Sequence, residues 1–255
     1  MSGGRHCYPN SETLVNKYHI RDKELLEKFE IQKVAVKLLG LDVKPERIAY
    51  TFDTEHLMQL HKYLFGDIYE WAGTVRDENI FKSERVLSGA SVEYTNYKDI
   101  TEKLTAMFEK YKTVNWQNAS NVSDMTTEFL LELWTIHPFR EGNTRTCVTF
   151  LWHYLKGRGI DFRLELLKNN PMYVRDSLVM ANYDQKQYIQ KIISDALLNP
   201  TVDKIYVQHE DPSGEEYQIA KADYETFREK YTIQKNDEII SREHTKKSKK
   251  VDYER

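Results

Sequence analysis

Hydrophobic residues recur every three or four positions over most of the first 200 residues, which is the spacing of one face of an α-helix. Gly40 is expected to end the first helix and Thr54 to cap the second. The chain is therefore predicted to be mainly α, with helices over residues 22–39, 54–71, 97–111, 164–167, 171–181 and 185–198.

Two more helices are predicted on either side of a polar loop. From Ser123 to Ile136 apolar residues surround nearly the whole helix circumference, which indicates a central, buried helix. Pro138 breaks it at His137, because proline lacks an amide hydrogen and disfavours α geometry in the residue before it. A new helix is expected to start near Asn143, so the pattern predicts helix, tight loop, helix with both helices buried.

Short segments replace the helical pattern in two places. "TVRDENIF" and "ASVEYT" lie on either side of Ser88-Gly89, which predicts a β-hairpin or loose flap over residues 76–96. Beyond Pro200 a hairpin, a helix and a charged tail are expected. The predicted organisation is an N-terminal helical region (1–49), a core (50–199) with the active-site loop at 137–145, and a small C-terminal α/β appendage (200–255).

Composition narrows the class of protein. At 255 residues with 40% hydrophobic content, the chain can bury one substantial core. The formal net charge of −3 provides no overall attraction for nucleic acid. No stretch resembles a signal peptide or a membrane span, so a cytoplasmic protein without a membrane or nucleic-acid partner is expected, with no oligomeric state specified.

Cysteine and histidine spacing suggests no disulfide and no transition-metal site. Cys7 and Cys147 fit no redox or zinc motif and are expected to be free thiols, with Cys147 in the core. His56, His61 and His153 lie on helical stripes without a matching set of carboxylates or thiols.

The polar loop "TIHPFREGNTRT", residues 135–146, combines groups that suit phosphate chemistry. It leads into a helix N-terminus, where unpaired amides and the helix dipole attract anions, and Gly142 permits close approach of a ligand. Arg145 adds a planar set of donors for phosphate oxygens. Glu141 would repel that anion unless Mg²⁺ stood between them, and His137 can remove a proton from an attacking hydroxyl. The loop therefore predicts phosphoryl or nucleotidyl transfer.

The same loop resembles the active-site motif of the Fic family, His-Pro-Phe-x-(Asp/Glu)-Gly-Asn-Gly-Arg-x-x-Arg. "LHKYLFGDIYEWAGTVR", residues 60–76, is similar to the helix and turn that precede the flap in this family. The resemblance covers residues 50–198 and implies a Fic-type helical bundle with a β-hairpin flap. The matching motif positions are His137, Pro138, Phe139, Glu141, Gly142, Asn143 and Arg145.

The resemblance implies a role for each matched residue. His137 would be the base that activates a target hydroxyl, and Glu141 would hold Mg²⁺ on the α- and β-phosphates of ATP. Gly142 and Asn143 would form the anion nest, while Arg145 would hold the β- and γ-phosphates. The implied activity is transfer of AMP from ATP to Ser, Thr or Tyr hydroxyls of a protein target.

The flap and one later helix are expected to complete the site. By resemblance, the flap binds the target backbone as an added strand, here near Ile80 and Lys82. The segment "VMANYD" is similar to the one that supplies an asparagine to the adenine, here Asn182. Self-modification is expected as well, at hydroxyls such as Thr201, Ser248 and Tyr253.

Two motif positions depart from the family at the phosphate end of the loop. Thr144 replaces the second glycine; its Cβ narrows the backbone approach, while its hydroxyl can donate to a phosphate. Val148 replaces the final arginine and removes a charge-assisted contact worth about 1.5–3 kcal/mol, which would weaken ATP binding or loosen the choice of nucleotide. Transfer of phosphate or of another nucleotide, and an inactive regulatory module, are the alternative interpretations.

Val148 also removes the usual partner of the family's inhibitory glutamate, which lies in a helical motif (Ser/Thr)-x-x-x-Glu-(Gly/Asn). The literal match, at residues 74–79, falls at the flap and not on a helix. The first helix presents Ile31 and Ala35 at the corresponding spacing, so residues 31–36 are predicted not to inhibit in the usual way.

Overall fold

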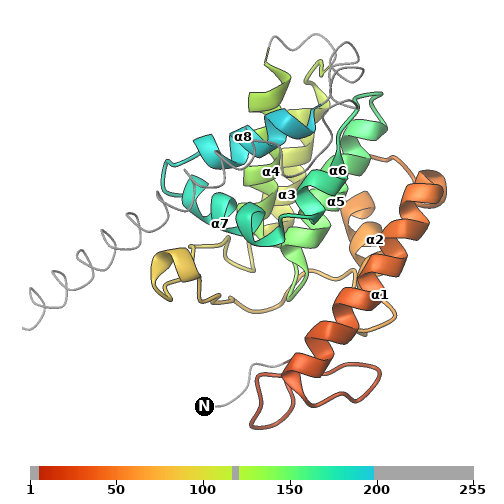
Figure 1. Cartoon of the computed structure of the whole chain (residues 1–255), viewed down its shortest axis with the longest axis vertical. Coiled ribbons are helices and arrows are strands. Elements are labelled where there is room, and N and C mark those ends of the chain that lie inside the picture. Colours follow the sequence, from red (N-terminus) through yellow and green to blue (C-terminus); the bar gives the residue numbers. More distant parts are fainter. Residues whose placement is uncertain (1–5, 117–120, 198–255) are drawn as a thin grey trace, which may run out of the picture. The chain divides into compact units, whose positions relative to one another are not determined.

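The computed structural model describes residues 6–116 and 121–197 of the chain. The predicted C-terminal appendage, residues 200–255, and its candidate self-modification sites lie outside this part. Within it the fold is mainly α, which confirms the sequence prediction (Figure 1). The helices are α1 (Lys23–Val43), η1 (Pro45–Arg47), α2 (Thr54–Phe65), η2 (Arg85–Leu87), α3 (Ile100–Lys112), α4 (Val122–Ile136), α5 (Asn143–Lys156), α6 (Leu164–Lys168), α7 (Pro171–Ala181) and α8 (Gln187–Ala196).

The chain divides into two compact units, which are described separately. The core unit comprises residues 1–79 and 94–162 and contains α1 to α5. The described part of the flap unit comprises residues 80–93 and 163–197 and contains η2 and α6 to α8. Among the described residues, none of these helices combines the length and apolar character that crossing a bilayer requires.

The core unit is built around α4 and α5, which pack against each other. α4 is buried on nearly all sides, as its sequence predicts, and α3 covers it. α2 packs on α5, and α1 packs on α2. Cys147 is a free, fully buried thiol in this core, as expected. The aromatic centre is formed by Phe129, Phe150 and Tyr154, whose rings contact one another.

α1 is longer than predicted. Asp22 caps it, with Oδ1 accepting the amide hydrogen of Leu25 at 2.7 Å. The helix does not end at Gly40 but continues to Val43. A Cβ at position 40 would lie 2.8 Å from the hydroxyl oxygen of Tyr63, so this glycine lets α2 approach closely instead of ending the helix.

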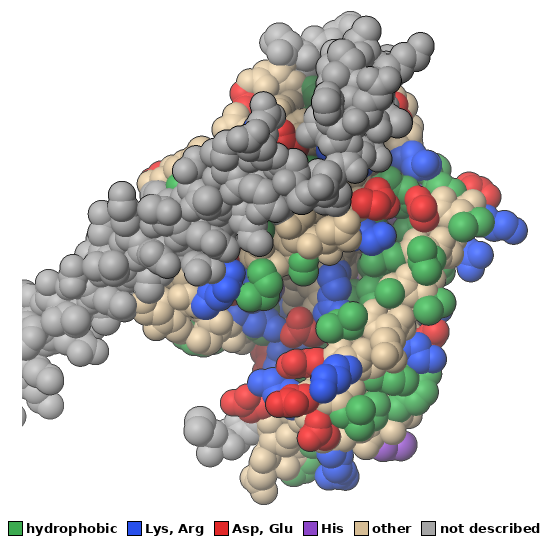
Figure 2. Space-filling model, in the orientation of Figure 1, with side chains coloured by type: hydrophobic (Ala, Val, Ile, Leu, Met, Phe, Trp, Pro, Cys, Tyr) green, Lys and Arg blue, Asp and Glu red, His purple; other side chains and the backbone are tan. Residues whose placement is uncertain are grey.

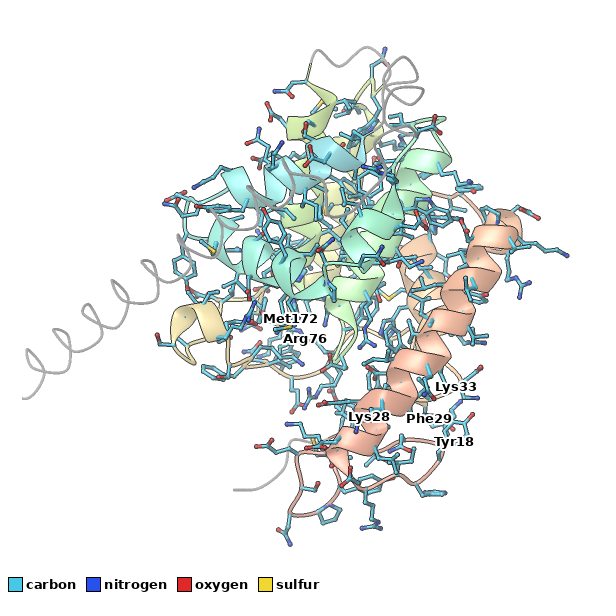
Figure 3. The ribbon with its side chains drawn as sticks, viewed as in Figure 1. Tyr18, Lys28, Phe29, Lys33, Arg76 and Met172 are labelled. Atoms are coloured by element: carbon cyan, nitrogen blue, oxygen red, sulfur yellow. The ribbon has the colours of Figure 1, made fainter. Side chains whose placement is uncertain are left out.

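The outward side of α1 carries several exposed apolar side chains, and hydrophobic side chains follow the helix in Figure 2. Tyr18 packs edge-on against Phe29 at 4.5 Å, and the ammonium of Lys33 lies over both rings (Figure 3). A narrow face of α1 points inward and is buried, and it includes the carboxylate of Glu30. The exposed side chains are Leu25, Ile31, Val36, Leu39 and Val43; the buried ones are Leu26, Glu30, Val34 and Leu41.

The ends of α2 and α4 also differ from the predictions. Asp53, not Thr54, caps α2, and this helix stops at Phe65 instead of reaching residue 71. α4 is capped by Asn121, two residues before the predicted Ser123. In each case a side chain that caps well lies just upstream of the predicted one.

Two buried imidazoles connect α2 with α5. The amide of Phe52 donates to His56 Nδ1 at 3.3 Å, so His56 Nε2–H donates to His153 Nδ1 at 2.7 Å. His153 Nε2–H in turn donates to the carbonyl of Pro45 at 2.7 Å. Burial lowers the pKa of both rings, that of His56 to about 3, and neutral tautomers satisfy the whole chain of bonds.

Buried neutral histidines should make the fold less stable at acidic pH. Besides His56, this concerns His61 of α2, which is also fully buried. His56 and His61 have folded-state pKa values of about 3, below the unfolded value near 6.5, so below pH 6.5 the unfolded chain binds protons that the folded chain refuses. The free energy of unfolding should fall by about 1 kcal/mol for each of them between pH 7.5 and 5.5. Urea denaturation at the two pH values measures this loss. His56→Gln should reduce it, and equal stability at both values would contradict the prediction.

Residues 76–96 were predicted to form a β-hairpin or a loose flap, and the structure shows no strand there. The amide of Glu84 donates to Ala90 O at 3.0 Å, and η2 with a left-handed Ser88-Gly89 turn fills the space between them. Burial of Val86 and Leu87 draws the tip into this compact turn, so a strand ladder does not form. Within the described part of the chain, β pairing is limited to an isolated bridge between Cys7 and Leu14.

The flap is fastened to α7 by two arginine–carboxylate pairs. Arg175 binds Glu84 with two parallel bonds, of 3.0 and 2.7 Å. Arg85 pairs with Asp176. Both carboxylates are buried, and bidentate arginine geometry fixes direction as well as distance. Residues 80–93 are therefore tied to a helix that follows them by about 90 positions in the sequence.

Candidate active site

The polar loop begins at His137, which ends α4 in the left-handed conformation (φ 51°, ψ 59°). Proline at position 138 prevents further helix and leaves this residue to reverse the chain direction. The imidazole is 2% exposed, and its Nδ1–H donates to the carbonyl of Trp134 at 3.0 Å. In this tautomer Nε2 carries the lone pair that can accept a proton.

Two aromatic rings fix the plane of this imidazole. Tyr94 lies over His137 with 3.8 Å between ring centroids and 32° between the ring planes, and Trp134 meets it edge-on at 5.3 Å. Tyr94 was not identified from sequence, because the segment before α3 carries no motif. The imidazole is thus oriented by one hydrogen bond and two rings.

Arg76 holds the first turn of the loop. It is 4% exposed; its Nε donates to His137 O at 2.8 Å, its Nη1 donates to Glu78 O at 2.8 Å and its Nη2 to Thr95 O. Its own amide donates to Pro138 O at 2.9 Å. A single side chain therefore satisfies three backbone carbonyls and joins the loop to the segments on both sides of the flap.

The middle of the loop is closed by Asn143. Its side-chain oxygen accepts the amide of Phe139 at 2.8 Å, and its side-chain nitrogen donates to Phe139 O at 2.7 Å. The side chain is thus used within the loop, and its contribution to an anion nest falls to the backbone N–H at the start of α5. The first helical amide bond in α5 runs from Thr146 to Gly142 O at 2.9 Å, which leaves the preceding amides at a helix N-terminus.

Gly142 adopts a left-handed conformation (φ 78°) against an aromatic ring. A Cβ at this position would lie 2.4 Å from Cζ of Phe65. Position 142 therefore needs glycine both for its backbone angle and for the close approach of Phe65.

His61 of α2 supports the loop through a hydrogen bond and a ring contact. Its Nδ1 accepts the amide of Gly73 at 2.8 Å, so its Nε2–H donates to Glu141 O at 3.1 Å. The ring stacks on Phe139 with centroids 3.7 Å apart, and burial lowers its pKa to about 3. His61 is thus a neutral support of the loop.

Glu141 is the carboxylate of the loop and is partly exposed. Its Oε1 accepts the amide of Gly142 at 3.0 Å, which places the carboxylate beside the helix N-terminus. In the described residues no three or more His, Cys, Asp or Glu side chains gather as a metal site. One carboxylate beside an anion nest still fits Mg²⁺, which is commonly held by one or two carboxylates together with substrate phosphates.

The two departures from the motif have visible consequences. Thr144 Oγ1 accepts the indole N–H of Trp134 at 2.9 Å, so its hydroxyl hydrogen remains a donor while the oxygen is oriented by α4. Val148 is buried in α5, where an arginine would bury a charge.

Arg145 points from the first turn of α5 to a carboxylate of α1. Its Nη2 pairs with Oε1 of Glu30, and its guanidinium carbon lies 4.9 Å from the ring centroid of Phe65. Sequence analysis missed Glu30, since nothing local marks a single glutamate on an apolar helix face as a partner of a loop 115 residues away.

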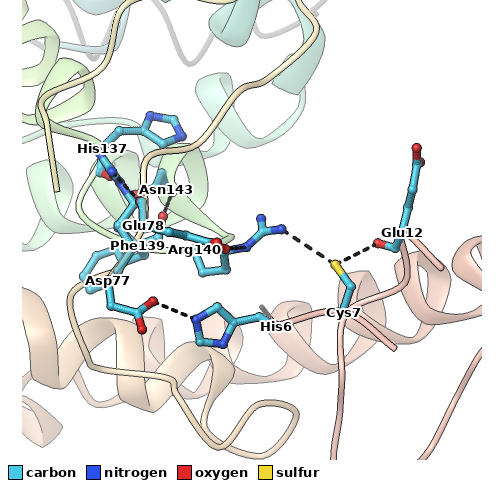
Figure 4. A network of polar contacts seen from close by, with 10 residues as sticks. His6, Cys7, Glu12, Asp77, Glu78, His137, Phe139, Arg140 and Asn143 are labelled. Atoms are coloured by element: carbon cyan, nitrogen blue, oxygen red, sulfur yellow. Dashed lines mark hydrogen bonds and ion pairs between the residues drawn. The ribbon is translucent and has the colours of Figure 1, made fainter. Parts of the chain in front are cut away.

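The N-terminal segment contacts the loop through Arg140 (Figure 4). Arg140 pairs with Glu78 at 3.3 Å, and its Nη2 lies 3.8 Å from the sulfur of Cys7. His6 meets Asp77 at 3.1 Å in the same network. Segments 6–12 and 77–78 thus brace the outer side of the loop.

The other predicted site residues lie in the flap unit. Ile80 and Lys82 precede η2, and the amide of Lys82 donates to Ser91 Oγ at 3.1 Å. Asn182 caps the end of α7, where its side chain donates to Leu178 O at 2.9 Å. The structure thus brings His137, Glu141, Gly142, Asn143, Thr144 and Arg145 together in the core unit and places these three in the other unit.

The loop joins α4 and α5, the two central helices of the core unit. Residues 51–155 of the chain match the Fic/DOC family. Residues 74–79 are the literal match to the helical inhibitory motif described above, and in this structure they are not helical.

Curated relatives and a solved structure are also similar to this chain. The chain is similar to protein adenylyltransferase VbhT of Bartonella schoenbuchensis, with 30% identity over 159 residues, 62% of this chain and 32% of VbhT. It is also similar to the probable protein adenylyltransferase y4lH of Sinorhizobium fredii, with 28% identity over 68% of this chain and 85% of that protein. The match thus spans about a third of VbhT.

The fold is similar to that of BepC from Bartonella tribocorum, whose crystal structure holds AMPPNP. The TM-score is 0.63 at 20% identity, over 76% of this chain and 96% of that chain.

Proposed function

We propose that this protein transfers AMP from ATP to hydroxyl groups of a protein target. The observation that carries the proposal is the loop itself: an oriented imidazole, a carboxylate and a helix N-terminus lie within nine residues, with an arginine beside them. Relatives named as protein adenylyltransferases, and AMPPNP bound to BepC, support the choice of ATP as donor.

His137 is the base in this reaction. Nε2 takes the proton of the target hydroxyl as its oxygen bonds to the α-phosphorus, and the bond from that phosphorus to the bridging oxygen breaks to release pyrophosphate. The bond from Nδ1–H to Trp134 O keeps the imidazole in the required tautomer and stabilises the positive ring that results.

The amides that begin α5 and the Thr144 hydroxyl bind phosphate oxygens, and Arg145 holds the β- and γ-phosphates. Glu141 would hold Mg²⁺, which neutralises phosphate charge when bound. Asn182 is assigned to the adenine, and Ile80 and Lys82 to the target backbone.

A second candidate, transfer of the γ-phosphate, is favoured by Thr144 and by the buried Val148, which both depart from the motif at the phosphate end. The loss of the final arginine also favours an inactive regulatory module. The oriented imidazole of His137 favours an active enzyme.

Labelled ATP separates these functions. The protein is incubated with Mg²⁺, a protein extract and ATP labelled at the α- or the γ-phosphate, with His137→Asn as the control. AMP transfer predicts protein label from the α-position alone, in the extract proteins and in the protein itself. Label from the γ-position alone would refute AMP transfer, and binding of ATP without any label would indicate an inactive module.

A further inference from the structure

Glu30 is a carboxylate at a position where α1 otherwise buries apolar side chains. It is 6% exposed and lies on the same face as Leu26 and Val34. A charge at such a position is costly unless both oxygens are paired. Here both are: Oε1 pairs with Arg145 Nη2, and Oε2 accepts the hydroxyl hydrogen of Tyr69 at 2.5 Å.

Tyr69 fixes the direction of this carboxylate. The residue belongs to the turn after α2, is 2% exposed and stacks on Trp71 with centroids 4.5 Å apart. Burial, and then the charge of Glu30, raise the pKa of Tyr69, so its hydroxyl keeps its proton and remains a donor. Three segments, α1, the turn after α2 and α5, therefore meet at one carboxylate.

Phe65 holds the guanidinium of Arg145 from another side. Its ring centroid lies 4.9 Å from the guanidinium carbon, and the same ring touches the backbone of Gly142. The guanidinium is therefore fixed beside the helix N-terminus that is assigned to phosphate. Arginine has five N–H donors, and Glu30 engages one of its three nitrogens, so donors remain for a ligand.

We propose that Glu30, oriented by Tyr69, is a positioning residue that fixes Arg145 for the phosphates of the bound nucleotide. The proposal rests on the proposed function only for the identity of that nucleotide. The opposite role, in which Glu30 competes with phosphate for Arg145, requires a carboxylate that can withdraw. Glu30 is part of the packing of α1 and is held at its second oxygen, so the geometry favours support.

Calorimetric titration of the full chain with ATP and with AMP tests this role. Glu30→Gln keeps the shape and a partner for Tyr69 but removes the ion pair. ATP binding should weaken about tenfold, while AMP binding changes less than about twofold, because Arg145 is assigned to phosphates that AMP lacks. Tyr69→Phe should shift ATP binding in the same direction. Glu27→Gln, at an exposed position one turn earlier on α1, is the matched control and should bind ATP normally.

A double-mutant cycle shows whether Glu30 acts through Arg145. In an Arg145→Ala background, Glu30→Gln should cause no further loss of ATP affinity. Tighter ATP binding by Glu30→Gln, an equal loss for ATP and AMP, or an undiminished effect without Arg145 would each overturn the proposal. Urea denaturation verifies that each variant is folded. If Glu30→Gln does not fold, the ATP affinity of Tyr69→Phe tests the proposal in its place. Binding is measured without transfer, so failure of the proposed AMP transfer is a separate result.

Discussion

Replacing His137 with asparagine should reduce AMP transfer by about a thousandfold, within the range lost when a general base is removed. Asparagine is the informative replacement because position 137 is left-handed (φ 51°), a conformation that asparagine tolerates and alanine does not. The loss should appear in kcat, since the imidazole acts on the hydroxyl and not on ATP. Initial rates with α-labelled ATP measure the effect.

The matched control for this variant is His19→Asn, because His19 is exposed and also left-handed (φ 54°). It should transfer AMP at the rate of the unchanged protein. ATP affinity of His137→Asn should stay within about threefold of that protein. A variant that retains more than a tenth of the rate would show that His137 is not the base.

Arg76→Ala should lower the free energy of unfolding by about 3 kcal/mol, the cost of leaving buried carbonyls without donors. The carbonyls concerned are those of His137, Glu78 and Thr95. Transfer should be lost even at temperatures where the variant is folded, because the backbone that carries the imidazole is no longer held. Arg76→Lys should recover little, since one ammonium cannot reach three divergent acceptors.

Urea denaturation and transfer rates of the same samples separate the two effects of Arg76. Arg47→Ala removes an exposed arginine that lies over the ring of Tyr63, and should change the unfolding free energy by less than about 0.5 kcal/mol. If Arg76→Ala is as stable as Arg47→Ala, the three carbonyl bonds do not contribute as described.

Local signals in the sequence were enough to predict the helices that carry the loop. The all-round apolar pattern of α4 and the break at Pro138 depend on neighbours within a few residues, and both are seen. Gly40 was misleading because it continues the helix, and its missing side chain makes room for Tyr63. The flap departed from its strand prediction because burial of its tip outweighs strand propensity.

The parts of the site that sequence could not predict come from distant segments. Glu30 and Arg145 are 115 positions apart, and Arg76 is 61 positions from His137. No periodicity within a helix encodes such pairs, since only tertiary packing brings them together. The matched family region begins at residue 51, after α1 has already supplied the carboxylate that Arg145 contacts.

The two arginine–carboxylate pairs between the flap and α7 have a thermodynamic consequence for target binding. A loop that must become ordered on binding loses conformational entropy at that moment, which weakens the complex. Arg175 and Arg85 already hold residues 84–85 before any target arrives. Under the proposed function, part of this entropic cost is therefore met by folding, which favours binding of an extended target segment through its backbone.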